Sequence, residues 1–285
     1  MAGAARRQVG DVSLDLPFKH WDLFAQGIWY TLHLTALSLF FGALIAVPTA
    51  FAMLRGGVSG SIAHGYVYLF RGTPLIVQTY LLYYGLSQFE VIRDTWLWRP
   101  PSYVRKACVE DFLFWKVCAG DFIPSLRSAW WCALIAFSLN SGAYVAEILR
   151  GALKNTPKGE LEAAKAMGLN EKQVRKLIHL PSAIRRALPQ YGNEVIFMLH
   201  GSAVASVITI QDILGAGRTL NAKYYVAYEG FLTAAFLYLC ITYMLVFLFR
   251  IVERRYLKHL NIDEPGAKRG WFGRTIAAPT PQTAR

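Results

Sequence analysis

The sequence is poor in charged residues. Only 17% of its 285 residues are charged, whereas a soluble domain carries about a quarter, and 54% are hydrophobic. The apolar residues lie in long blocks: residues 231–249 contain no charged side chain, and residues 28–54 contain only His33 as a possible one. Each block can cross a hydrocarbon core, which requires about 20 helical residues. The composition excludes a soluble globular domain and predicts an integral membrane protein.

The sequence also lacks the motifs of nucleotide binding, metal binding and catalysis. There is no GxxxxGK[ST] loop, and GAGRT at residues 215–219 has glycines but no such lysine, so we interpret it as a flexible outer turn. No HExxH, paired CxxC or GxSxG occurs, and the six histidines have no metal-ligand spacing. We expect no catalytic residue, no metal and no cofactor in this chain.

The net charge of +12 does not indicate a nucleic-acid partner. The basic residues cluster in loops and in the C-terminal tail between apolar blocks, which is the distribution that orients a protein in a lipid bilayer. Asp11 and Asp15 lie near the start, and no apolar run precedes Pro17. A cleavable signal peptide needs such a run, so we expect the first apolar block to direct the chain to the membrane.

The hydropathy pattern predicts an all-α fold with five transmembrane helices. Their approximate bounds are residues 24–54, 62–89, 129–150, 191–212 and 230–252. The second is interrupted by RGTP at residues 71–74. Because a proline kinks a membrane helix and frees a carbonyl, a neighbouring helix must bind that carbonyl. This span should therefore lie within a helix bundle.

The distribution of lysine and arginine predicts the orientation. Eighteen basic residues lie on the side that holds residues 150–190 and the C-terminus, and eleven lie on the other side. The positive-inside rule then places the C-terminus in the cytoplasm and the N-terminus outside. We expect an outer segment at 1–22, a transmembrane domain at 23–262 with an outer loop at 91–127, and a flexible cytoplasmic tail at 263–285.

A polar stretch, NTPKGELEAAKAMGLNEKQVRKLIHLP at residues 155–181, separates the third and fourth predicted spans. Thr156 is expected to cap a first helix that ends at Gly168, a natural left-handed C-terminal residue. Asn170 is expected to cap a second helix that ends at Pro181, with Gln173 completing a capping box. Two stiff helices favour a docking element for a cytoplasmic partner over the alternative, a solvated connector.

Four motifs resemble a known family. Glu162-Ala163-Ala164, followed by Gly168 and by I-x-L-P at 178–181, resembles the EAA…G…I.LP signature of permease subunits in ABC importers. FRGTPLIVQ (70–78), SLNSGAYVAEILRGAL (138–153) and NEVIFMLHGSAVASVITIQDIL (193–214) resemble its polar amino acid subfamily. The likeness covers about residues 20–262 and points to subunits that import histidine, lysine, arginine, ornithine or opines. The outer loop 91–127 is longer than is usual for the family.

The resemblance implies a type I ABC importer permease in a bacterial inner membrane. ATP and Mg²⁺ would be bound by a separate cytoplasmic ATPase dimer, and the partners would include a second, similar but distinct permease and a periplasmic amino-acid-binding protein. In that family the loop corresponding to residues 155–190 carries a coupling helix that sits in a groove of the ATPase. The expected docking residues are Glu160, Leu161, Glu162, Ala163, Ala164, Gly168 and Leu169.

Polar residues inside the third and fourth spans suggest a substrate pathway, because ionisable groups in a bilayer usually face the bundle interior. Carboxylates would suit a cationic amino acid. The candidates are Asn140, Tyr144 and Glu147, which share one helical face, and Glu194, His200 and Ser202. The alternative is that these groups tie helices together or pair with Arg71, Arg150 or Arg185.

Three further points stay open on the sequence alone. Cys108 and Cys118 lie in the outer loop, where an oxidising compartment permits a disulfide, but two free thiols are the alternative. An ion-coupled secondary transporter is disfavoured because no internal repeat is visible. A non-transporting membrane anchor is disfavoured by the polar residues deep in the spans.

Overall fold

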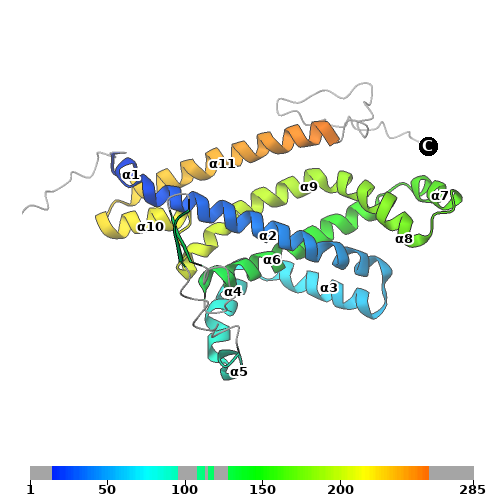
Figure 1. Cartoon of the computed structure of the whole chain (residues 1–285), viewed down its shortest axis with the longest axis horizontal. Helices are drawn as coiled ribbons and strands as arrows, with labels where there is room; N and C mark the ends of the chain where they lie inside the picture. Colours follow the sequence, from blue (N-terminus) through cyan, green and yellow to red (C-terminus); the bar gives the residue numbers. More distant parts are fainter. Residues whose placement is uncertain (1–14, 96–107, 113–114, 119–127, 257–285) are drawn as a thin grey trace, which may run out of the picture.

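Four long helices run side by side along the length of the molecule (Figure 1). They are α2 (Trp21–Arg55), α6 (Ala129–Lys154), α9 (Leu180–Gly201) and α11 (Ala227–Tyr256). The structure, a computed structural model, describes residues 15–95, 108–112, 115–118 and 128–256. Most of the predicted outer segment 1–22 lies outside these ranges, and so does the whole of the predicted tail 263–285.

Shorter elements connect the long helices. They are α1 (Asp15–Lys19), α3 (Gly57–Gly72), α4 (Leu75–Tyr80), the π-helical η1 (Leu81–Gly85), the 3₁₀-helical η2 (Leu86–Gln88), α5 (Glu90–Arg93), α7 (Lys158–Ala166), α8 (Glu171–Gln173), the π-helical η5 (Val174–His179), the 3₁₀-helical η6 (Ser202–Ile208) and α10 (Ile213–Tyr224). Strands β1 (Cys108–Phe112) and β2 (Trp115–Cys118) pair antiparallel. The fold is all-α, as predicted, and this short hairpin in the loop between α5 and α6 is an addition that was not predicted.

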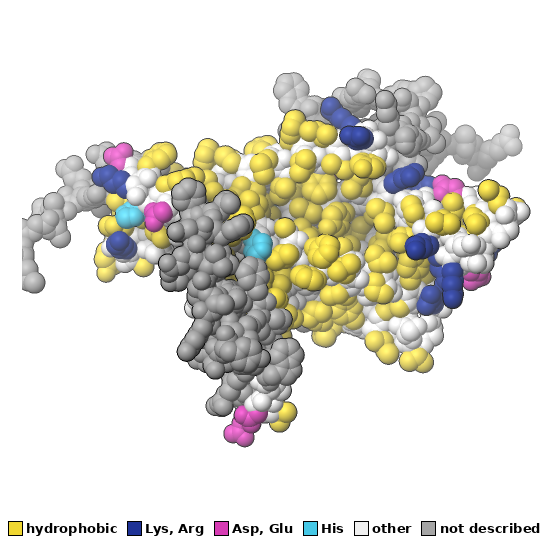
Figure 2. All heavy atoms as spheres, in the orientation of Figure 1, with side chains coloured by type: hydrophobic (Ala, Val, Ile, Leu, Met, Phe, Trp, Pro, Cys, Tyr) yellow, Lys and Arg dark blue, Asp and Glu magenta, His cyan; other side chains and the backbone are white. Residues whose placement is uncertain are grey.

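The described residues contain three helices that are long and apolar enough to cross a membrane alone, namely α2, α6 and α11. A fourth candidate is the bent pair Glu171–Ile208 and Ile213–Tyr224, which meet at 41°. The second predicted span, residues 62–89, is not one continuous helix, because it breaks between α3 and α4. A hydrophobic band covers the middle of the molecule, and charged side chains gather at its ends (Figure 2).

Helix α6 is the centre of the bundle. Its most apolar window is 72% buried, compared with 33% for α2 and 17% for α11. It packs on α2 through small side chains, because a Cβ atom on Gly42 would lie only 3.0 Å from the backbone nitrogen of Gly142. Ser38 and Ser141 are buried beside them. Close approach of backbones at small residues is how helices associate in lipid.

The break in the second span is held by hydrogen bonds from neighbouring side chains. Pro74 cannot donate to the carbonyl of Phe70, one helical turn earlier. That carbonyl instead accepts from Gln78 Nε2 at 2.9 Å and from Asn140 Nδ2 of α6 at 3.0 Å. Asn140 Nδ2 also donates to Gln78 Oε1 at 3.1 Å. The prediction that Pro74 breaks the helix and that a neighbouring helix binds the freed carbonyl is confirmed.

The prediction that a helix ends at Pro181 is wrong. Instead, α8, η5 and α9 follow one another without a break, and Pro181 lies in the first turn of α9. The turn before the proline is wide: the backbone N–H of Leu180 donates to the carbonyl of Arg175, five residues earlier. A π turn of this kind accommodates the missing proline N–H without ending the helix.

The fourth span bends at its far end. Thr209 has a left-handed backbone (φ 73°), and the Asp212 side chain accepts from the backbone N–H of Gly215 at 2.7 Å, which starts α10. Residues 215–219 are therefore helical, and their interpretation as a flexible outer turn is wrong. The bend amounts to 41°, and the chain reverses after α10, at the left-handed residue Tyr225, so that α10 packs on α11 where Gly217 faces Gly230.

Candidate functional site

The polar stretch between α6 and α9 lies at one end of the bundle (Figure 1). Its first helix, α7, has Pro157 rather than Thr156 at the N-cap position, and no side chain caps it. Thr156 is buried and donates to the carbonyl of Ala152 at 3.3 Å, so it belongs to the end of α6. The prediction of a Thr156 cap is therefore wrong.

The joint between α7 and α8 is a compact turn. Gly168 has a φ of 83°, and its N–H donates to the carbonyl of Lys165 at 2.9 Å. The N–H of Leu169 donates to the carbonyl of Ala164 at 3.3 Å, which completes a Schellman motif. Asn170 and Gln173 then form a capping box with two bonds of 2.9 Å. The predictions for Gly168 and Asn170 are confirmed.

The predicted docking residues divide between two faces of α7. Ala164 is 3% exposed and faces the chain itself, so the expectation that a partner approaches at this residue is not supported. Glu160 also turns inward, toward α9, where its carboxylate accepts from Ser182 Oγ at 2.7 Å and from Arg186 at 2.8 Å. The exposed face holds Glu162 and Ala163. Leu161 and Leu169 are half-buried, and Gly168 is exposed.

Met167 was not among the predicted residues, yet it is 81% exposed beside Gly168. A large apolar side chain held out at a rigid turn is suited to insert into a partner. Its spacing of four residues from Ala163 places it on the same side of the helix. This periodicity could have identified it.

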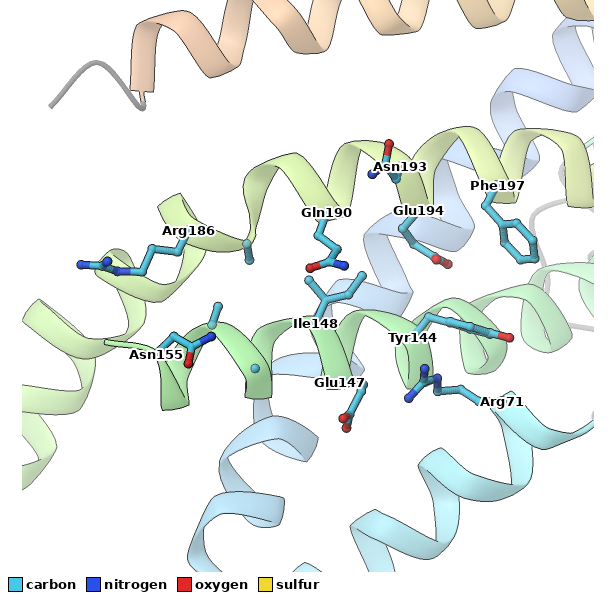
Figure 3. A pocket seen from close by; sticks show the side chains of 13 residues that line it. Arg71, Tyr144, Glu147, Ile148, Asn155, Arg186, Gln190, Asn193, Glu194 and Phe197 are labelled. Atoms are coloured by element: carbon cyan, nitrogen blue, oxygen red, sulfur yellow. The ribbon is translucent and has the colours of Figure 1, made fainter. Parts of the chain in front are cut away.

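A groove of about 640 Å³ lies between α6 and α9, and the end of α3 borders it (Figure 3). Its lining consists of Arg71, Tyr144, Glu147, Ile148, Gly151, Ala152, Asn155, Arg186, Ala187, Gln190, Asn193, Glu194 and Phe197. Three predicted pathway residues, Tyr144, Glu147 and Glu194, are thus brought together. Gln190 and Asn193 also line the groove but were not predicted. Gln190 lies one helical turn before Glu194 and Asn193 lies next to it, so their positions on α9 could have identified them.

Opposite charges face this groove. The Glu194 side chain extends from α9 toward α6 (Figure 3), and the residue is only 6% exposed. Its Oε1 is a buried oxygen without a hydrogen-bond partner among the described residues. The guanidinium of Arg71 lies 5.1 Å from the centre of the Tyr144 ring, a cation–π contact. Glu147 is already paired with Arg150, whose Nε donates to it at 2.8 Å.

The other predicted pathway residues lie elsewhere. Asn140 holds the break in the second span, as described above. His200 forms a 3.0 Å hydrogen bond with Thr242 of α11, and Ser202 donates to the carbonyl of Leu199 within its own helix. For Asn140 and His200 the structure supports the alternative, in which polar groups tie helices together, whereas the bond of Ser202 to Leu199 is local.

The strand register in the outer loop places Cys108 opposite Cys118. Residues directly opposite in an antiparallel pair have Cα atoms about 4.5–5.5 Å apart, which lies within the range of a disulfide. Their side chains lie outside the described residues, so the disulfide stays a prediction.

Comparison with known proteins identifies related chains. The family described as "binding-protein-dependent transport system inner membrane component" matches residues 38–258. The octopine transport system permease protein OccM of Rhizobium radiobacter is 37% identical over 82% of this chain and 86% of its own. The histidine/lysine/arginine/ornithine transport system permease protein HisM of Escherichia coli K12 is 36% identical over 82% of this chain and 89% of its own.

A solved structure has the same fold. Its title is "Crystal structure of an amino acid ABC transporter with histidines", and one of its chains superposes with a TM-score of 0.68 at 29% sequence identity. The superposition covers 86% of this chain and 99% of that one.

Proposed function

The chain belongs to the family of binding-protein-dependent transport system inner membrane components, and from this premise we propose that it imports amino acids or opines as one half of an ATP-driven channel. It is a permease subunit of an ABC importer, and ATP hydrolysis belongs to a separate subunit. The proposed substrate class rests on the charged groove between α6 and α9. It is also supported by the sequence identity of more than a third to permeases named for octopine and for basic amino acids.

The groove offers complementary groups to a zwitterion. The guanidinium of Arg71 would bind a carboxylate, and the unpartnered oxygen of Glu194 would accept a hydrogen bond from an ammonium or guanidinium group. Tyr144 and Phe197, whose ring centres lie 5.9 Å apart, would form an apolar wall for the substrate's carbon chain. Glu147 also lines the groove, but Arg150 neutralises its charge, so Glu194 is the carboxylate proposed to bind the substrate.

The proposed topology has five crossings, in which the broken pair α3 and α4 counts as one. The docking segment lies at the same end of the bundle as the C-terminal end of α11, where Arg254 and Arg255 are located (Figure 1). Basic residues at both segments support a cytoplasmic location for this end and an outer location for the N-terminus, in a bacterial inner membrane.

The proposed partners follow from this arrangement. The exposed face of α7, with Glu162, Ala163 and Met167, would dock one subunit of an ATPase dimer that binds ATP and Mg²⁺. A soluble binding protein would deliver substrate from outside. A second, different permease would complete the channel, by analogy with the importers that this chain resembles.

Transport by a reconstituted complex tests the proposal. Proteoliposomes would contain this chain with its ATPase and second permease, and uptake of labelled arginine, histidine or octopine would be measured in the presence of the binding protein. Uptake is expected to require ATP and to stop when the phosphate-binding lysine of the ATPase is replaced. Uptake that survives this replacement but stops when ion gradients are dissipated would indicate a secondary transporter instead.

The composition of the complex is tested separately. If this chain purified with only the ATPase forms a stable assembly that transports substrate, the proposal of a second, different permease is wrong.

A further inference from the structure

One ion pair links the docking helix α7 to the groove-lining helix α9. The Glu160 carboxylate accepts from Arg186 at 2.8 Å through Oε1 and from Ser182 Oγ at 2.7 Å through Oε2. The side chains of Arg186 and Glu160 are 23% and 38% exposed, so solvent reaches the pair only in part. Both carboxylate oxygens of Glu160 are thus bound to a single turn of α9.

The same face of α9 continues into the groove. Arg186, Gln190 and Glu194 recur every four residues, so they lie on one side of the helix, and all three line the groove (Figure 3). Among the described residues, Glu160 is the one carboxylate that pairs with Arg186, whose buried Nε has no hydrogen-bond partner there. The position of this guanidinium therefore depends on Glu160.

The Schellman turn alone does not fix the angle between α7 and the continuous helix formed by α8, η5 and α9. It joins α7 to α8 at one point, Gly168, and a single joint leaves room for rotation about its backbone torsions. Burial of the small side chain Ala164 against the chain adds little area. The second contact is at Glu160, eight residues before Gly168 and near the other end of α7. Together the two contacts fix the angle between α7 and α9.

We propose that Glu160 is a positioning residue, which makes α7 and α9 move as one rigid unit, so that displacement of the docking helix by the ATPase reaches the groove at Glu194. The inference rests on the proposed function, because it names the contact through which hydrolysis and transport are coupled. Glu160 itself need not touch substrate or ATPase.

The first test measures coupling in proteoliposomes that contain the complete complex. Glu160→Gln removes the charge but keeps the shape, and we expect normal assembly with about a threefold rise in ATP hydrolysed per substrate imported. This modest factor is what a partly exposed ion pair can provide. The swapped pair Glu160→Arg with Arg186→Glu should bring the ratio back toward the wild-type value.

A matched control is Glu171→Gln. Glu171 lies in the same segment and pairs with Arg175 at 3.9 Å, but its side chain is 77% exposed and it does not line the groove. Its coupling ratio should stay at the wild-type value. A Glu160→Gln ratio equal to that of this control would overturn the inference, as would a charge swap that restores nothing.

A second measurement does not depend on transport. Spin labels at Ala166 on α7 and Arg185 on α9, both exposed, report the distance between the helices. We expect a narrow distribution in the wild type and a broader one in Glu160→Gln. Equal widths would overturn the inference even if the complex transports normally, whereas a wild-type complex without ATP-driven uptake would overturn the proposed function.

Discussion

Gly168 offers a direct test of the docking segment's shape. Its φ of 83° lies in the left-handed region, and a Cβ atom placed there would meet nothing within 4 Å. A substitution therefore causes backbone strain without a steric clash with other residues. The left-handed conformation costs an L-residue about 1–2 kcal/mol, and a β-branched side chain increases this cost. We expect Gly168→Val to destabilise the joint by about 2 kcal/mol.

Gly159 provides the matched control. It lies within α7, and a Cβ atom there would also meet nothing within 4 Å, but its backbone is helical. Gly159 is the second residue of α7, so its replacement by alanine should stabilise the helix by less than the roughly 0.5–1 kcal/mol expected in the middle of a helix. Gly159→Ala should therefore strengthen α7, while Gly168→Val weakens its junction with α8.

Amide hydrogen exchange in detergent micelles measures the effect locally. Because about 1.4 kcal/mol corresponds to a tenfold change in an equilibrium constant, the amides of α7 should exchange roughly tenfold or more faster in Gly168→Val. The amides of α6, deep in the bundle, should not change. Co-purification of the ATPase should fall in parallel. Unchanged exchange in α7 together with normal ATPase association and transport would refute the view that this turn sets the shape of the docking surface.

Three further predictions concern Asn140, Glu194 and the pair Cys108 and Cys118. Asn140→Leu leaves Gln78 Oε1 without the donor it has in the structure, so unfolding by SDS in mixed micelles should show a loss of about 2 kcal/mol. Ser138→Ala removes a buried hydroxyl that has no hydrogen-bond partner within the described part of the chain, so it should show almost no loss; equal losses would contradict the role of Asn140. Glu194→Gln should reduce uptake of arginine about tenfold while assembly with the ATPase is unchanged, and normal uptake would remove Glu194 from the pathway. Cys108→Ser should make the remaining outer cysteine reactive toward a membrane-impermeant maleimide, whereas two reactive thiols in the non-reduced wild-type protein would exclude the disulfide.

The features predicted correctly from the sequence depend on short stretches of chain. Gly168 ends its helix, Asn170 caps the next, and Pro74 breaks the second span, because each effect is set by backbone torsions and hydrogen bonds within a few residues. The apolar blocks likewise predict α2 and α11 closely, since a bilayer selects for length and hydrophobicity.

The errors concern contacts between distant residues and exceptions to local rules. The hydrogen bond from Asn140 to the carbonyl of Phe70 was not predicted, because the two residues are 70 positions apart in the chain. Ala164 and Glu160 were assigned to the docking surface, because sequence does not reveal which side of a short helix faces its own chain. Pro181 was expected to end a helix, and the π turn that accommodates it has no strong sequence signal.

The uninterrupted course of Glu171–Ile208 has a mechanical consequence. At about 1.5 Å per residue, its 38 residues extend over roughly 57 Å, which exceeds the roughly 30 Å thickness of a hydrocarbon core. If it pivots near its middle, a tilt of about 5° displaces each end by roughly 2.5 Å in opposite directions. In the proposed transporter the helix would act as a lever, because a push on one end moves the other end in the opposite direction. The bend at Thr209 ends one arm of this lever, and the π turn before Pro181 lies in the other.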